Sequence, residues 1–221
     1  MSATDPTVRQ AAFARAEAAL AEATAAHPGS AELLADWGNA ALGASDLGIA
    51  TLAFRRALLA DGDHGRARRN LTWLRSRLPD NLRPHEGGAT ATLFFFHGAW
   101  SRATRLIVGA LAFAAAALLL APWRRRPGGG RIALALAPAL LWILMTGSVL
   151  LQRSPAADGV VVQSQVLRSA DSAGAPAATA TPLPPGAEVT ILERRDGWTR
   201  LRTAGGLSGW LPDSAVAAVV R

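Results

Sequence analysis

The chain of 221 residues contains no cysteine and no lysine. Without cysteine, neither a disulfide framework nor a thiolate metal site can form. All 23 basic residues are therefore arginine, which together with abundant alanine indicates a GC-rich bacterial genome. The formal net charge of +7 is typical of proteins that bind nucleic acid. Here, however, the arginine clusters flank apolar runs, so we expect a membrane protein and no nucleic-acid partner.

Signatures of catalysis are also missing. The sequence has no His-Glu metal spacing, no Gly-x-Ser-x-Gly elbow and no Walker loop. Asp61 and Asp63 begin like a calcium loop, but the later ligands and the closing glutamate are absent, so we interpret them as a turn between helices. The histidines are scattered through predicted loops and linkers: His27, His64, His85 and His97. We therefore expect no enzymatic activity, no metal and no cofactor.

Two apolar runs dominate the middle of the chain. Residues 106–123 and 132–151 contain no charged side chain. At 1.5 Å per residue they extend roughly 27 and 30 Å as helices, which matches the hydrocarbon thickness of a bilayer. Pro138 lies inside the second run, and membrane helices tolerate such a proline. The sequence predicts two transmembrane helices over 106–151, and a buried hairpin of a soluble protein is the alternative.

The connection between the runs is a short basic loop, residues 124–131. Its arginines are Arg124, Arg125, Arg126 and Arg131. Short arginine-rich loops stay on the cytoplasmic side, so the loop predicts two spans in the bacterial inner membrane with both termini periplasmic. Arg102, Arg105 and Arg153 on the outer flanks oppose this orientation.

The proposed orientation requires transport of about 100 N-terminal residues across the membrane. The first twenty residues lack the apolar core of a signal peptide. Either a signal sequence precedes this chain or the topology is reversed, and both alternatives remain open.

The N-terminal region, residues 1–78, contains a helical repeat pattern. Residues 31–64 fit a 34-residue frame. Its characteristic large and small positions are occupied by Leu34, Trp37, Gly38, Ala41, Ala50, Phe54 and Ala57. This pattern resembles the tetratricopeptide (TPR) repeat, a pair of antiparallel helices. A helix from Pro6, capped by Asp5, precedes it, and a closing helix ends before Pro79. One full repeat with a half on either side suggests truncation at the front or stabilisation by a partner.

The TPR resemblance implies that partner segments bind on the concave face. Asn39 and Asn70 fall where carboxylate-binding TPR proteins carry asparagines, but Ala35 stands where such a clamp has lysine. Arg66, Arg68 and Arg69 are further candidates for contact with an acidic partner, and a solvated helix face is the alternative.

Residues 79–105 form a linker and a juxtamembrane segment, and residues 152–158 form a tether after the second run. Phe94, Phe95, Phe96 and Trp100 precede the first run, where aromatic side chains anchor at lipid headgroups.

The C-terminal region, residues 159–221, shows alternating short strands separated by turns. It resembles the bacterial SH3-like barrel through Val166, Arg168, Gly186, Val189, Trp198, Leu201, Gly209, Trp210 and Leu211. Trp198 and Trp210 have two interpretations, packing in the barrel core or stacking on a ligand. The family resemblance implies binding of peptidoglycan or of peptide segments.

The expected fold is thus multidomain: all-α TPR hairpins, a two-helix transmembrane hairpin and an all-β SH3-like barrel. This order resembles the TPR-bearing membrane protein of bacterial aerotolerance (Bat) operons. The resemblance implies partners among MoxR-type ATPases and membrane proteins with von Willebrand factor A domains. We expect a non-enzymatic adaptor that holds protein partners at the bilayer, and the alternative is a module that binds or senses peptidoglycan in the cell wall.

Overall fold

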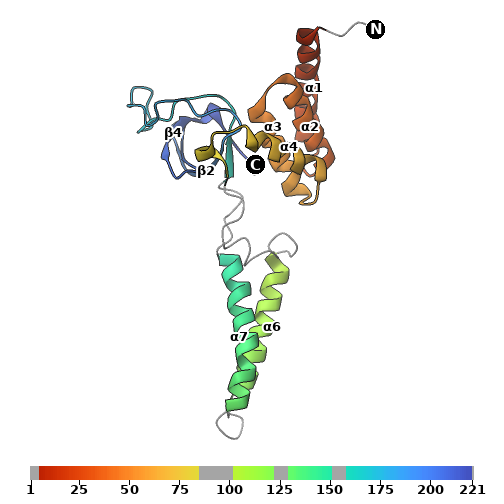
Figure 1. The fold of residues 1–221 in the computed structure, drawn as a ribbon, viewed down its shortest axis with the longest axis vertical. Helices are drawn as coiled ribbons and strands as arrows, with labels where there is room; N and C mark the ends of the chain where they lie inside the picture. Colours follow the sequence, from red (N-terminus) through yellow and green to blue (C-terminus); the bar gives the residue numbers. More distant parts are fainter. Residues whose placement is uncertain (1–4, 85–101, 122–128, 151–157, 221) are drawn as a thin grey trace. The chain divides into compact units, whose positions relative to one another are not determined.

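The computed structural model describes residues 5–84, 102–121, 129–150 and 158–220. The chain forms two compact units. The first combines the N-terminal helices (through His85) with the C-terminal strands (from Ser154), and the second, Glu86–Arg153, holds the two apolar helices. Helices, strands and apolar helices are therefore all present, as the sequence predicts (Figure 1).

The helices of the first unit follow one another with short connections. They are α1 (Pro6–Ala26), α2 (Ala31–Ala44), α3 (Leu47–Ala60) and α4 (Gly65–Ser76), followed by the short 3-10 helix η1 (Asp80–Leu82). Each α-helix begins at a side chain that accepts a hydrogen bond from the first helical turn, which satisfies a backbone N–H that lacks an intrahelical acceptor. The caps are Asp5, Ser30, Asp46 and His64. The predicted start at Pro6 and the predicted end before Pro79 are confirmed.

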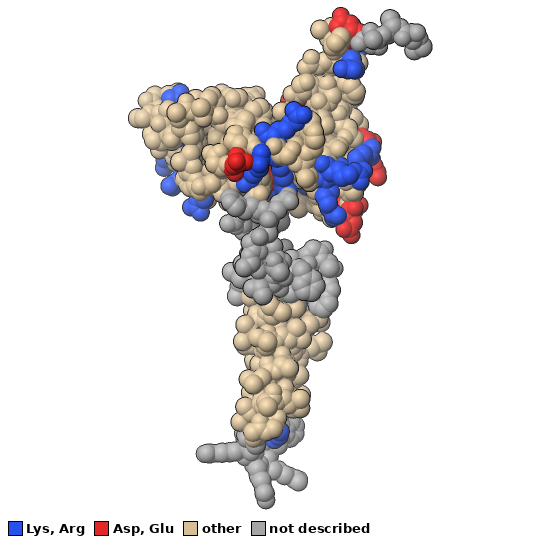
Figure 2. Space-filling view, in the orientation of Figure 1, with Lys and Arg blue, Asp and Glu red and all other residues tan. Residues whose placement is uncertain are grey.

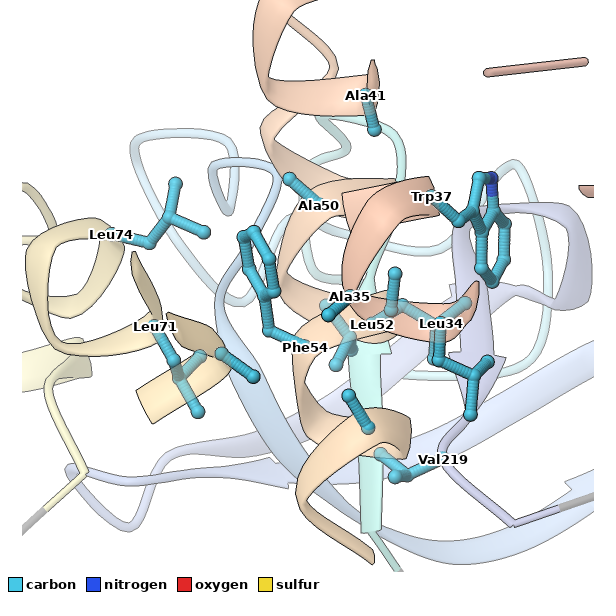
Figure 3. Close-up of a cluster of buried hydrophobic side chains, with 14 residues drawn as sticks. Leu34, Ala35, Trp37, Ala41, Ala50, Leu52, Phe54, Leu71, Leu74 and Val219 are labelled. Carbon is cyan, nitrogen blue, oxygen red and sulfur yellow. The ribbon is translucent and has the colours of Figure 1, made fainter. Parts of the chain in front are cut away.

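Small residues allow α2 and α3 to approach closely. A Cβ atom added at Gly38 would lie 2.6 Å from the ring of Phe54, which is fully buried. Figure 3 shows Phe54 of α3 between α2 and the leucines Leu71 and Leu74 of α4. The predicted helix packing around Gly38 and Phe54 is therefore confirmed.

The strands form one antiparallel sheet. They are β1 (Asp158–Val161), β2 (Glu188–Arg195), β3 (Trp198–Thr203), β4 (Ser208–Pro212) and β5 (Val216–Ala218). Their order in the sheet is β4-β3-β2-β1-β5. Strands β1 to β4 fall in the segments whose alternation predicts strands, whereas β5 was not predicted. The short β5 follows the 3-10 turn η4 (Asp213–Ala215), and its pairing with β1 defines it as a strand.

One face of the sheet is covered by the long segment between β1 and β2, residues 162–187, which we call the excursion. Leu167 and Leu183 of this segment are buried against Leu201 and Leu211 of β3 and β4. A Cβ atom at Gly209 would lie 2.6 Å from the side chain of Leu167, so the excursion can approach β4 only because that residue is glycine.

The helices and the sheet of the first unit share a hydrophobic core. Val160 of β1 and Val219, next to β5, belong to the cluster of buried residues that fills the helical part. A Cβ atom at Gly48 of α3 would lie 2.6 Å from the Cα atom of Val162. The sequence predicts the two parts as separate domains and gives no indication of this contact.

In the second unit, α6 (Arg102–Leu120) packs beside α7 (Gly129–Leu150) (Figure 1). Both are long and apolar enough to cross a membrane, over Ala103–Leu120 and Gly129–Val149. Only 22% and 17% of these residues are buried, whereas the core helices of a soluble protein are mostly buried. The described surface of these helices is almost free of charged side chains, as Figure 2 shows.

Both apolar helices begin earlier than the predicted runs, so that Arg105 lies inside α6 rather than on its flank. Its side chain is 1% exposed and donates a hydrogen bond of 2.8 Å to the hydroxyl of Ser148 on α7. Close to it, Gly109 of α6 leaves room for Met145, and further along Phe113 contacts Trp142 with ring centroids 5.1 Å apart. The hairpin therefore combines close packing at small residues with a buried polar contact between Arg105 and Ser148.

Candidate interaction surfaces

The first candidate surface is a polar face formed by α2 and α4. Asn39 and Asn70 lie opposite each other on these helices, and the Asn70 amide donates a hydrogen bond of 2.7 Å to the Asn39 side-chain oxygen. The structure thus brings together the two asparagines named from the sequence. Ala35, at the place of the clamp lysine, lies fully buried in the helical core.

Arg66 lies on the same face but is occupied by carboxylates of α2. Its guanidinium forms ion pairs with Glu32 at 2.5 Å and with Asp36 at 3.0 Å. The three side chains are between 42% and 74% exposed, so water screens the pairs and they contribute little to stability. An acidic partner that binds Arg66 has to compete with two carboxylates that the chain already supplies.

His64 completes the polar face at the start of α4. The side chain is 7% exposed, and its Nδ1 atom accepts a hydrogen bond of 3.2 Å from the backbone N–H of Ala67. Because Nδ1 is an acceptor, the proton of the neutral ring is on Nε2, which lies 3.4 Å from a Glu32 carboxylate oxygen. His64 therefore caps the beginning of α4.

The second candidate surface is the face of β3 and β4 that carries Trp198 and Trp210. Arg200 is paired with Trp210, and Trp198 with Pro212, so that both indoles project from the same face of the sheet. Trp210 is 7% exposed, yet it does not belong to the core cluster behind the sheet. It is buried beside the excursion, since Arg168 exchanges two backbone hydrogen bonds with it.

Arg195 connects this tryptophan face to the excursion. Its guanidinium lies 5.4 Å from the centroid of the Trp210 ring, a cation–π geometry. The same guanidinium donates two hydrogen bonds, of 2.8 and 2.6 Å, to a carboxylate oxygen of Asp171. These hydrogen bonds hold the pKa of Asp171 below its ordinary value, and the partner carboxylate raises the pKa of Arg195. The excursion is thereby attached to the sheet next to Trp210.

A third group of charged residues joins the helices to the sheet, and sequence reasoning missed it. Glu188 of β2 accepts hydrogen bonds from Arg75 of α4 at 2.6 and 3.1 Å. The same carboxylate lies 2.8 Å from Arg55 of α3, which also pairs with Asp158 at the start of β1. Nothing in the spacing of these residues could have indicated the group, because the partners are more than 100 positions apart.

Arg56 of α3 adds a further contact at this junction. It donates hydrogen bonds of 3.0 and 2.8 Å to the backbone carbonyls of Val219 and Ala218. These acceptors lie at the edge strand β5, so that α3 covers an edge that would otherwise present unpaired carbonyl groups.

Of the loop arginines, the predicted Arg124, Arg125 and Arg126 lie outside the described residues. Arg131, near the start of α7, donates a hydrogen bond of 3.2 Å to the carbonyl of Ala121 at the end of α6. It therefore satisfies a helix-end carbonyl group.

The remaining candidate ligands do not gather into a site. Asp61 and Asp63 lie in the turn between α3 and α4, where the Asp61 carboxylate accepts a hydrogen bond from the Asp63 backbone N–H. Within residues 5–84, 102–121, 129–150 and 158–220, no three metal-ligating side chains lie together. His85 and His97 are outside these ranges.

No protein-family model, curated protein or solved structure matches this chain.

Proposed function

We propose that the protein is a non-enzymatic, membrane-anchored adaptor that holds protein partners at the bacterial cell envelope. In this proposal, the α1–α4 hairpins act as TPR-type helices, the sheet acts as an SH3-like module, and α6 and α7 cross the inner membrane. The resemblance to the TPR-bearing proteins of Bat operons proposes MoxR-type ATPases and von Willebrand factor A membrane proteins as the partner classes.

The observation that carries the proposal is the shared core of the helices and the sheet. An even number of spans returns the chain to the side from which it entered, and the contacts of Arg55 and Arg75 with Glu188 require α3, α4 and β2 on one side. Two spans therefore suit a chain whose N-terminal and C-terminal parts fold together. The result is one body with two candidate surfaces, the α2/α4 polar face and the tryptophan face, at the membrane.

The orientation of this body is proposed from the basic loop. Arg131 and the three preceding loop arginines favour a cytoplasmic loop, which places the helices and the sheet in the periplasm. Reporters that work only in the cytoplasm or only in the periplasm, fused at residue 221 and in the 127–130 loop, test this. A cytoplasmic signal at residue 221 would reverse the orientation and remove the cell wall as a partner.

The adaptor proposal is tested by site-directed crosslinking with the full chain, because it has no native cysteine to interfere. We place single cysteines at Asn39 and Arg66 on the polar face, with Leu59 as an exposed control on α3. Crosslinks to a reproducible protein partner from the polar face, and none from Leu59, support the adaptor. Absence of a protein crosslink from Asn39, from Arg66 and from a further single cysteine at Trp198 on the tryptophan face contradicts it.

Peptidoglycan binding remains the second candidate, favoured by the partly exposed indole of Trp198 beside Arg195 and Arg200. The test uses the full chain in detergent with purified wall sacculi, since a fragment starting at residue 159 would expose Val160 and Val219 and leave Glu188 unpaired. Sedimentation with sacculi that is lost in Trp198→Ala would favour wall binding over the adaptor. No sedimentation would exclude it.

A further inference from the structure

We propose that an exposed stripe on α4, formed by Arg69, Trp73 and Arg77, docks on the anionic lipid headgroups of the membrane that α6 and α7 cross. The proposal rests on the membrane anchoring in the proposed function and goes beyond it by assigning a lipid-binding surface to the helical part. The candidate surfaces described above do not include Trp73 or Arg77.

The three residues lie on one side of the helix. They are spaced four positions apart, which places Arg69 and Trp73 of α4 and the C-cap residue Arg77 in one row. The core-facing residues Ala67 and Leu74 are buried on the opposite side of the helix. Trp73 is 44% exposed, and the guanidinium of Arg77 stacks on its ring at 4.0 Å from the centroid. The row therefore presents an indole with a stacked cation to the surroundings.

The stripe has an excess of positive charge. The α4 sequence contains no acidic residue. Arg66 and Arg75 of this helix are neutralised by carboxylates of α2 and β2. Arg69 and Arg77, in contrast, have no carboxylate within ion-pair distance among the residues that the structure describes. Their positive charges remain available for an external anion.

The chain length between the units keeps a bilayer within reach. Seven residues, 151–157, separate the end of α7 from β1, and they span at most about 25 Å when fully extended. The chain enters the first unit at Asp158, which is joined to α4 through Arg55, Glu188 and Arg75. The short tether therefore gives the headgroups next to α7 a high effective concentration for the first unit.

The chemistry of the stripe suits a headgroup layer. An indole ring with one polar N–H is typical of the membrane–water interface, where apolar and polar groups meet. Guanidinium groups bind phosphate oxygens through charge-assisted hydrogen bonds, and surface charge on anionic lipids attracts basic segments. An acidic protein segment could use the same arginines, but the tether and the indole both favour the lipid surface.

The test measures the environment of a spin label beside the stripe in the full chain. Ser76→Cys is a nearly isosteric exposed site on α4, and Ser214→Cys in η4 is the matched control site. Each labelled chain is reconstituted in vesicles of phosphatidylcholine alone or with added phosphatidylglycerol. Accessibility of the label to dissolved oxygen is compared with its accessibility to a water-soluble nickel chelate.

We expect phosphatidylglycerol to shift the label at Ser76 from a water-like to a lipid-like accessibility and to leave the label at Ser214 unchanged. The shift should be lost at high salt, which screens exposed charges, and in the double variant Arg69→Gln, Arg77→Gln. The charge-matched double variant Arg200→Gln, Arg202→Gln removes two exposed arginines from the sheet and should retain the shift.

Three results would overturn the proposal. The first is a label at Ser76 that stays water-accessible with both lipid compositions. The second is an equal loss of the accessibility shift in the stripe double variant and in the control double variant of the sheet. The third is protection of the label by soluble polyglutamate but not by phosphatidylglycerol, which would assign the stripe to an acidic protein. Flotation after a carbonate wash distinguishes failure of the stripe proposal from failure of the proposed membrane anchoring. A chain that leaves the vesicles contradicts the anchoring by α6 and α7 itself.

Discussion

Arg75 of α4 and Glu188 of β2 are 113 positions apart in the sequence and form a two-point ion pair, with hydrogen bonds of 2.6 and 3.1 Å. The side chains are only 19% and 10% exposed, so the charges are largely withdrawn from water. The pair joins the N-terminal helices to the C-terminal sheet across a chain segment that contains both apolar helices.

Replacement of Glu188 by alanine should destabilise the first unit. The change removes the carboxylate that Arg55 and Arg75 share and should cost about 3 kcal/mol, the order expected when one partner of a mostly buried ion pair is removed. The measurement is the free energy of unfolding of the full chain in detergent, followed by circular dichroism. Glu193→Ala is the control, because Glu193 is 44% exposed and its pair with Arg200 is worth at most about 1 kcal/mol. Equal losses in the two variants would mean that the junction contributes no more than a surface pair.

Gly38→Ala should disrupt the contact between α2 and α3. The new methyl group would lie 2.6 Å from the Phe54 ring, which is fully buried and cannot swing into solvent, so we expect a loss of about 1–3 kcal/mol. Gly29→Ala serves as the control, because no atom lies within 4 Å of the added Cβ and its φ is not positive. Thermal unfolding of both variants checks the prediction, and an unchanged midpoint for Gly38→Ala would show that the helices can separate without cost.

Glu17→Gln should stabilise the protein at neutral pH. Burial, with a smaller contribution from the nearby Asp46 carboxylate, raises the pKa of Glu17 above its ordinary value. The folded state therefore binds the proton more tightly than the unfolded state, so that the wild-type chain loses stability as the pH rises from the ordinary glutamate pKa through the raised one. Unfolding at several pH values between 4 and 7, a window of roughly the glutamate range, should show a shallower decline for Glu17→Gln. A steeper decline would contradict the assignment.

Asp171→Asn should have the opposite pH signature. Hydrogen bonds from Arg195 lower the pKa of Asp171, so its contribution to stability is present above the ordinary aspartate pKa and disappears as the pH falls through the lowered value. The variant should lose stability at neutral pH and show less acid sensitivity below about pH 4. Tryptophan fluorescence during acid unfolding is suitable because Arg195 also lies over Trp210. Identical acid transitions in variant and wild type would remove Asp171 from the attachment of the excursion.

Local features of the sequence predicted much of the fold. The cap at Asp5, the small residue at Gly38 opposite Phe54, and the alternation in β2 and β3 act over a few residues or within one helix pair, and the structure contains each of them. The short strand β5 escaped prediction, because three residues carry too little alternation to identify a strand and only its pairing with β1 defines it.

The candidate surfaces were predictable in part. The repeat frame named Asn39 and Asn70, and the structure places them in contact. The repeat frame gave no indication that Arg66 is neutralised by Glu32 and Asp36, since ion pairs depend on which helix faces meet. The stripe of Arg69, Trp73 and Arg77 has a visible spacing, but its exposure could be established only once the buried side of α4 was known.

The sequence by itself determined the helices, most of the strands and two runs apolar enough to cross a membrane, because caps, periodicity and hydropathy are properties of neighbouring residues. Only the tertiary structure decided that helices and sheet share one core around Val160 and Val219, and that Glu188 binds Arg55 and Arg75. The physical reason is that burial and charge pairing depend on distances in space, and residues more than 100 positions apart carry no local signal of their contact.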